Sequence, residues 1–344
     1  MKTPSTRDMR RILFATDLTT RSKAAWLRAA SLARQTGARL TVLHVIDSEQ
    51  SERVARMRAN RAYVELLSQA DRVFGSAAGF IDVVVRRGRV RDVIAGTAQE
   101  WDADLIVVAA PKSRRLDSIV GTTAERLVRT AKRPVLVVRR DMQDSYGNVA
   151  IAADLSSASL PMMRTAIRLA ALDNAAATIV HAIHPSYDGT MRSVGLDEST
   201  IARYQRSSQE AARQRLQAMI ADAGLPPGST RVVVRGDPPA AAIRTVLEYE
   251  RPELLAIGAS RWFLIKRLLV GSVADRLLRS APCDVLVIPY RPDVLKLGAP
   301  TAVESDRLSA APVRRDITTM AGFVPIQSRL EKRDGGDRRT HAHE

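Results

Sequence analysis

Cysteine, aromatic side chains and long apolar runs are all scarce in this sequence. Cys283 is the only cysteine among 344 residues, so no disulfide can form within the chain and a reducing compartment is expected. Aromatic residues make up 4% of the chain, which predicts a core of aliphatic side chains. No apolar stretch approaches the roughly 18 residues of a membrane-spanning helix, and no signal-peptide apolar region follows the basic residues 1–11. We therefore expect a cytoplasmic protein with no membrane contact.

The charge of the chain is strongly positive, with a formal net charge of +16. Most of the excess lies in residues 1–144, where arginine is abundant. Such a field attracts nucleic acid weakly and without sequence preference. Arginines on solvated surfaces explain the charge more simply, so nucleic-acid binding is kept as an alternative that rests on charge alone.

The most informative feature of the sequence is an internal repeat. Asp17 in Phe-Ala-Thr-Asp-Leu-Thr matches Asp154 in Ile-Ala-Ala-Asp-Leu-Ser, and His44 matches His181 at the same spacing. The matching segments are residues 11–19 with 148–156, 40–45 with 177–182, 121–127 with 271–277, and 135–138 with 285–288. Because the spacing grows along the chain, segment 184–230 must hold about thirteen extra residues in the second repeat.

Each repeat alternates short aliphatic runs with helical stretches, such as 22–36 and 91–101. Nearly continuous aliphatic runs are typical of strands buried on both faces, and their alternation with helices predicts a parallel, doubly wound α/β sheet. The expected strands are 12–15, 40–46, 81–85, 105–109 and 135–138 in the first repeat, and 149–153, 177–183, 230–235, 253–258 and 284–289 in the second.

The sequence thus predicts two tandem α/β domains with parallel five-stranded sheets, over residues 8–140 and 147–291. Residues 292–344 end in a highly charged stretch and are expected to form a flexible, largely disordered tail. A short polar connector would bring the last strands, 135–138 and 285–288, close enough to pair within one chain. We expect an intramolecular pseudo-dimer that remains a monomer in solution.

In the second repeat, the residues that could bind a ligand or take part in a reaction stand at the ends of predicted strands. Ligands bind at these ends in open α/β sheets. Asp154 closes the first strand and Gly258 the fourth. Gly271 and Ser272 open the helix 273–280, and a helix N-terminus offers free N–H groups that suit a phosphate. Alternatively, the two glycines only shape a loop and a helix start.

This arrangement resembles the universal stress protein family, whose fold is that of the adenine-nucleotide alpha-hydrolases. The nucleotide-binding members share Gly, two residues, Gly, nine residues, Gly and then Ser or Thr. Here Gly258, Arg261, Gly271 and Ser272 stand at that spacing, with Arg261 in place of the middle glycine. The resemblance implies bound ATP, with Asp154 near the ribose and adenine. It also implies that Ala182 and Ile257 lie near the adenine, and that Gly258, Gly271, Ser272 and Val273 lie near the ribose and phosphates.

Two features limit where ATP is expected. Arg261 either blocks the phosphate or binds it with its guanidinium. In the first repeat Ala109-Ala-Pro-Lys112 replaces the first glycine pair, and eight residues instead of nine precede Gly121. The Cβ of Ala109 stands in the path of a phosphate, and Pro111 removes a backbone donor. We therefore expect ATP in the second repeat alone.

No catalytic machinery is evident in the sequence. Asp17 and Asp154 lack a partner carboxylate or histidine nearby in sequence, and no set of residues has the spacing of metal ligands. His44 and His181 lie within apolar strands and are expected to be structural. The resulting hypothesis is a non-catalytic stress-response protein with unknown protein partners. The alternatives are a stress protein that binds no nucleotide and acts through protein or other small-molecule partners, and, less favoured, an adenylating enzyme.

Overall fold

A computed structural model describes most of the chain between residues 9 and 289. The described ranges are 9–49, 51–74, 81–110, 123–139, 145–156, 159–170, 175–183, 188–225, 228, 230–258 and 273–289. The segment 292–344 that was predicted to be a tail lies outside them. So do three of the predicted site residues, Arg261, Gly271 and Ser272.

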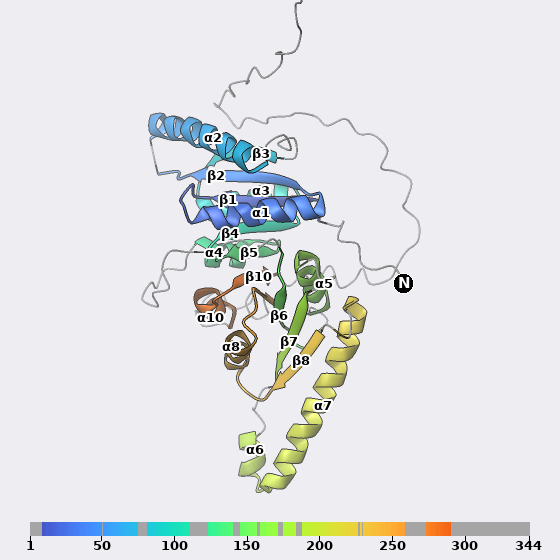
Figure 1. Ribbon diagram of the computed structural model, residues 1–344. Helices are drawn as coiled ribbons and strands as arrows, with labels where there is room; N and C mark the ends of the chain where they lie inside the picture. Colours follow the sequence, from blue (N-terminus) through green and yellow to red (C-terminus); the bar gives the residue numbers. More distant parts are fainter. Residues whose placement is uncertain are drawn as a thin grey trace, which may run out of the picture. The chain divides into compact units, whose positions relative to one another are not determined.

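The first repeat alternates strands and helices as its aliphatic runs predict (Figure 1). Its elements are β1 (Arg11–Thr16), α1 (Ser22–Thr36), β2 (Arg39–Ile46), α2 (Glu52–Phe74), β3 (Ile81–Arg87), α3 (Val90–Glu100), β4 (Leu105–Ala109), α4 (Thr123–Thr130) and β5 (Val135–Val138). Glycine ends α1 because Gly37 adopts a left-handed φ of 71° and its N–H bonds the carbonyl of Ala33.

The second repeat follows the same order with one addition. Its elements are β6 (Asn148–Ala152), α5 (Ser159–Ala170), β7 (Ala176–Ala182), α6 (Asp188–Ser193), α7 (Glu198–Ala223), β8 (Thr230–Arg235), α8 (Pro239–Tyr249), β9 (Leu254–Gly258), α10 (Val273–Ser280) and β10 (Asp284–Ile288). Among the described residues between β2 and β3, helix α6 has no counterpart. It lies in the segment predicted to hold the extra residues. Asp197 caps α7 by accepting the N–H of Thr200.

The ten strands form one sheet in the order β3-β2-β1-β4-β5-β10-β9-β6-β7-β8. Pairing is parallel within each repeat and antiparallel between β5 and β10, where Leu136 stands opposite Leu286. Both repeats therefore have the same strand order, and their last strands meet as predicted. The two predicted five-stranded sheets are joined into one mostly parallel sheet.

Two apolar layers cover the sheet, one on each face. The layer that contains Leu136 and Leu286 also contains buried residues of α1, α2, α5 and α7. The layer that contains Val135, Val285 and Cys283 also contains buried residues of α3, α4, α8 and α10. Both layers continue across the antiparallel pairing of β5 with β10, which is the joint between the two repeats. Cys283 is fully buried within one of the layers. No helix in the described ranges is long and apolar enough to cross a membrane.

The joint should contribute strongly to stability. Leu286 is fully buried on β10, so Leu286→Ala should lower the free energy of unfolding by about 2–5 kcal/mol. Val64→Ala on α2 is the control, because Val64 is 65% exposed and its truncation should change stability by about 0.5 kcal/mol or less. Urea unfolding followed by circular dichroism measures both. Equal effects of the two variants would contradict a packed joint.

Candidate functional site

Asp154 lies at the carboxyl end of β6, in the loop that leads to α5. Its Oδ1 accepts hydrogen bonds from the Ser159 hydroxyl at 2.8 Å and the Ser156 amide at 3.2 Å, and also from the Ser156 hydroxyl. In the part of the chain that the structure describes, no group donates to Oδ2, and the residue is exposed. The described part of the loop therefore orients the carboxylate through one of its two oxygens.

A histidine fixes the backbone immediately before this aspartate. His181 on β7 donates from Nδ1 to the carbonyl of Ala153 at 2.9 Å. The first repeat has the same bond, since His44 on β2 donates from Nδ1 to the carbonyl of Thr16 at 2.9 Å. Because a carbonyl oxygen only accepts, Nδ1 of each ring is the donor in this bond. These bonds hold the strand ends that precede Asp17 and Asp154.

Three other predicted residues lie on the strands next to Asp154. Ala182 ends β7 and Gly258 ends β9, and both strands pair with β6. Ile257 is 4% exposed and stands opposite Ala152 of β6. The side chains of Ile257 and Ala182 belong to the same apolar layer. The structure thus brings Asp154, Ala182, Ile257 and Gly258 to one edge of the sheet.

The packing of the described residues does not require a glycine at position 258. A Cβ added there would meet only the Sδ of Met162, at 3.6 Å, which is an ordinary van der Waals contact. Its φ lies outside the left-handed range that favours glycine. Within the described residues, no protein atom explains why this exposed strand end carries no side chain.

The phosphate end of the predicted site is described only in part. Val273 is the first described residue of α10, the helix that was predicted over 273–280. Arg261, Gly271 and Ser272 lie outside the described residues, so their predicted contacts stay predictions. Among the described residues, no group of three or more His, Cys, Asp or Glu side chains could hold a metal ion.

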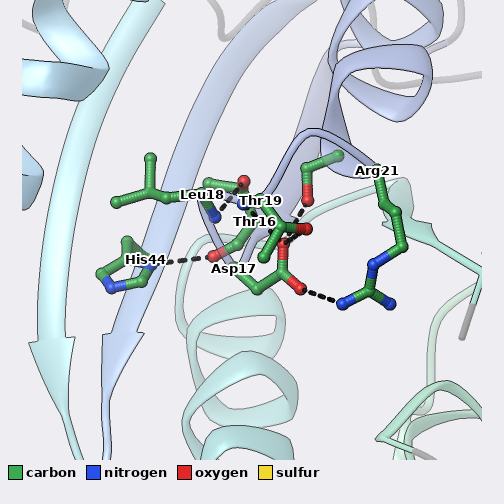
Figure 2. Close-up of polar contacts among 7 residues, drawn as sticks. Thr16, Asp17, Leu18, Thr19, Arg21 and His44 are labelled. Atoms are coloured by element: carbon green, nitrogen blue, oxygen red, sulfur yellow. Dashed lines mark hydrogen bonds and ion pairs between the residues drawn. The ribbon is translucent and has the colours of Figure 1, made fainter. Parts of the chain in front are cut away.

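The first repeat arranges the matching aspartate differently (Figure 2). Asp17 Oδ1 accepts from the Thr19 amide at 3.0 Å, the Thr19 hydroxyl at 2.7 Å and the Ser22 hydroxyl at 2.7 Å. Its Oδ2 pairs with the guanidinium of Arg21 at 3.3 Å. In the second repeat the sequence has Ala158 at the place of Arg21. Both oxygens of Asp17 are therefore engaged by its own loop.

The contacts around Asp17 stabilise its ionised form. Partial burial acts to raise the pKa of this carboxyl, but the hydrogen bonds from Ser22 and Thr19, together with the charge of Arg21, outweigh burial and lower the pKa below its usual value. Arg21 was not singled out in the sequence. The signal was its position four residues after Asp17, combined with alanine at the matching place in the second repeat.

The fold and the site define a tandem α/β protein with an exposed aspartate after the first strand of its second repeat. The model of the universal stress protein family matches residues 9–139 and 145–289. The chain therefore belongs to the universal stress protein family, in a tandem form with two such domains.

Individual relatives agree with this assignment. A universal stress protein of Mycobacterium tuberculosis is 24% identical over 234 residues, which cover 64% of this chain and 77% of the relative. Universal stress protein G of Salmonella typhimurium is 32% identical over 127 residues, or 34% of this chain and 89% of the relative. The crystal structure of a universal stress protein from Archaeoglobus fulgidus covers 82% of this chain and 99% of its own, with a TM-score of 0.58 at 18% identity. The likeness in structure supports the fold.

The lowered pKa of Asp17 predicts a pH-dependent contribution to stability. A carboxyl whose pKa is lower in the folded than in the unfolded chain stabilises the fold fully above the unfolded value, near 3.8, and loses this effect as pH falls through the folded value. Asp17→Asn should lower the free energy of unfolding at pH 7 by about 1 kcal/mol or less, because the site is half exposed and water screens the ion pair.

Urea unfolding at several pH values measures this effect, with Asp71→Asn, an exposed position on α2, as the control. The difference between wild type and Asp17→Asn should narrow as the solution becomes more acidic than pH 3.8. A difference that is constant or widens in acid would show that the carboxylate contacts of Asp17 do not stabilise the folded chain.

Proposed function

We propose that this chain is a non-catalytic stress-response protein that binds an adenine nucleotide, ATP, in its second repeat and none in its first. The bound nucleotide acts as a signal or stabiliser and is read by protein partners. The observation that carries the proposal is the unequal state of the two aspartates. Asp154 has an oxygen to which no described group donates, whereas Arg21 occupies the matching oxygen of Asp17.

Gly258 provides independent support. A glycine that the packing does not need, at the exposed end of a central strand, suits close approach of a ligand to the backbone. The first repeat has Ala109 at the end of the matching strand β4. Helix α10, which is described from Val273 onward, would offer the backbone N–H groups of its first turn to a phosphate near Gly271 and Ser272.

The site suits binding better than catalysis. Asp154 is hydrogen-bonded to serine side chains of its own loop. His181, the histidine on the neighbouring strand β7, uses Nδ1 to bond a backbone carbonyl. Neither contact pairs an acid with a base near a reacting atom. We propose the cytoplasm as the location, since the chain has a single cysteine and uses no disulfide of its own.

The two aspartates give a matched pair of variants. Asp154→Ala should weaken ATP binding by about tenfold or more, which corresponds to a loss of about 1.4 kcal/mol. Asp17→Ala should leave the affinity within about twofold, because Asp17 contacts no ligand. Isothermal titration calorimetry should give about one ATP per wild-type chain. Two equivalent sites, or equal losses in the two variants, would contradict binding in the second repeat alone.

Gly258→Ala tests the close approach of the ligand. Because the added methyl contacts only Met162 at an ordinary distance, thermal stability should be unchanged or slightly raised. The affinity for ATP should fall by about tenfold. Gly96→Ala on α3 is the matched control, since its added methyl meets nothing within 4 Å, and it should bind ATP as wild type does. Unchanged binding by Gly258→Ala would remove this support.

The natural occupant can be identified directly. Purified protein should be denatured, and the small molecules that it releases should be analysed by mass spectrometry. Release of an adenine nucleotide supports the proposal. A chain that releases none and binds no added ATP favours the alternative, a stress protein that acts through other partners.

A further inference from the structure

A buried polar cluster lies at the joint between the two repeats. Its centre is Asp284, the first residue of β10, which is 0% exposed. The hydroxyl of Tyr146 donates to Asp284 Oδ2 at 2.8 Å, and Arg28 Nε lies 3.8 Å from the same oxygen. The guanidinium of Arg28 lies over the Tyr146 ring, 4.1 Å from its centroid. The backbone N–H of Arg139 donates to Asp284 Oδ1 at 2.8 Å.

The members of the cluster come from both repeats. Arg28 lies on α1 and Arg139 follows β5 in the first repeat. Tyr146, just before β6, and Asp284 lie within the second family match, residues 145–289. Arg28 is 4% exposed and Tyr146 is 2% exposed. A buried charge is tolerated when opposite charge and hydrogen bonds compensate its lost hydration. The first repeat therefore supplies the guanidinium and the backbone N–H that compensate the buried carboxylate of the second repeat.

The cluster exists once, although the two repeats are related. The spacing of the repeat defines the matching positions, and none of them can make the same contacts. The matching residues are Thr165 for Arg28, Met9 for Tyr146, Pro134 for Asp284 and Pro289 for Arg139. Threonine carries no charge, methionine donates no proton, Pro134 has no carboxylate and Pro289 has no backbone N–H.

We propose that this cluster makes the joint selective: the β5 edge of the first repeat fits the β10 edge of a second repeat and rejects another first repeat, and the β10 edge likewise rejects another second repeat. This selectivity is independent of nucleotide binding.

The consequences for like pairs follow from the matching positions. Two first repeats joined through β5 would bury Arg28 against Met9 and Pro134, with no carboxylate. Two second repeats joined through β10 would place Asp284 against Thr165 and Pro289. That carboxylate would then lose both the guanidinium and the backbone N–H. The uncompensated charge acts against each like pair, while the aliphatic strand contacts alone do not distinguish them.

The first test is partner exchange in a chain cut between its repeats. A protease site introduced within residues 140–144 allows the purified full chain to be cleaved while its halves stay associated. Cleaved samples with and without ¹⁵N label are mixed in urea below the unfolding midpoint, and native mass spectrometry follows the pairs. Mixed-label pairs show that exchange has occurred. Random pairing would place about half of the pairs in the unlike class, whereas we expect unlike pairs to outnumber like pairs by more than tenfold.

The double variant Arg28→Met/Asp284→Leu removes both charges from the cluster. Its cleaved halves should pair nearly at random, with like pairs as frequent as unlike ones. Thr165→Val changes the position that matches Arg28. Its cleaved halves should give the same ratio of unlike to like pairs as the wild-type halves. Random sorting of the wild-type halves, or unchanged sorting in the double variant, would overturn the proposal.

A second test uses the intact chain and needs no exchange. Arg28→Met and Asp284→Leu should each lower the urea midpoint of unfolding, because each leaves part of a buried polar cluster uncompensated. The double variant should have a higher midpoint than either single variant. Additive losses in the double variant would show that Arg28 and Asp284 do not act together, and would overturn the proposal.

Discussion

The antiparallel pairing of β5 with β10 is the constraint on which the rest of the structure depends. It turns the edge strand of each repeat into an interior strand, so the two aliphatic layers continue across the joint. It also sets the direction of the repeats. Because the strands are parallel within each repeat and antiparallel at the joint, the carboxyl ends of β1 and β6 point in opposite directions. The two candidate sites are therefore separate and cannot share one ligand.

The two repeats share the same backbone arrangement and differ in the side chains that follow the carboxyl ends of their strands. In both, a histidine bonds the carbonyl before the aspartate, and hydroxyl groups of the following loop orient the carboxylate. The difference lies in the second carboxylate oxygen. Arg21 occupies it in the first repeat, where the charge of Asp17 is compensated within the loop. Arg21 pairs with the second oxygen of Asp17, whereas no described group donates to the second oxygen of Asp154.

Much of this fold could be predicted because its signals are local. Aliphatic runs located the strands, with ends that differ by one or two residues, as in β1. The repeat predicted the common strand order and the joint. Helix α6 was missed because its six residues carry no strong periodicity. The cluster at the joint was also missed. Tyr146 and Asp284 lie 138 residues apart, and neither residue is repeated at the matching position of the first repeat, so the internal repeat did not point to them.

The candidate site was predictable to the extent that strand ends determine it. Asp154, Ala182, Ile257 and Gly258 meet because parallel strands end at one edge of the sheet. The hydrogen bonds within each loop depend on side-chain conformations, so the capture of Asp17 by Arg21 became evident only in the structure.

Photoaffinity labelling with 8-azido-ATP, followed by peptide mapping of the full chain, tests most directly the claim that nucleotide binding belongs to one repeat. The account predicts labelled peptides within residues 148–289 and their loss when excess ATP competes. Equal labelling of peptides within residues 9–139, competed by the same ATP, would contradict it.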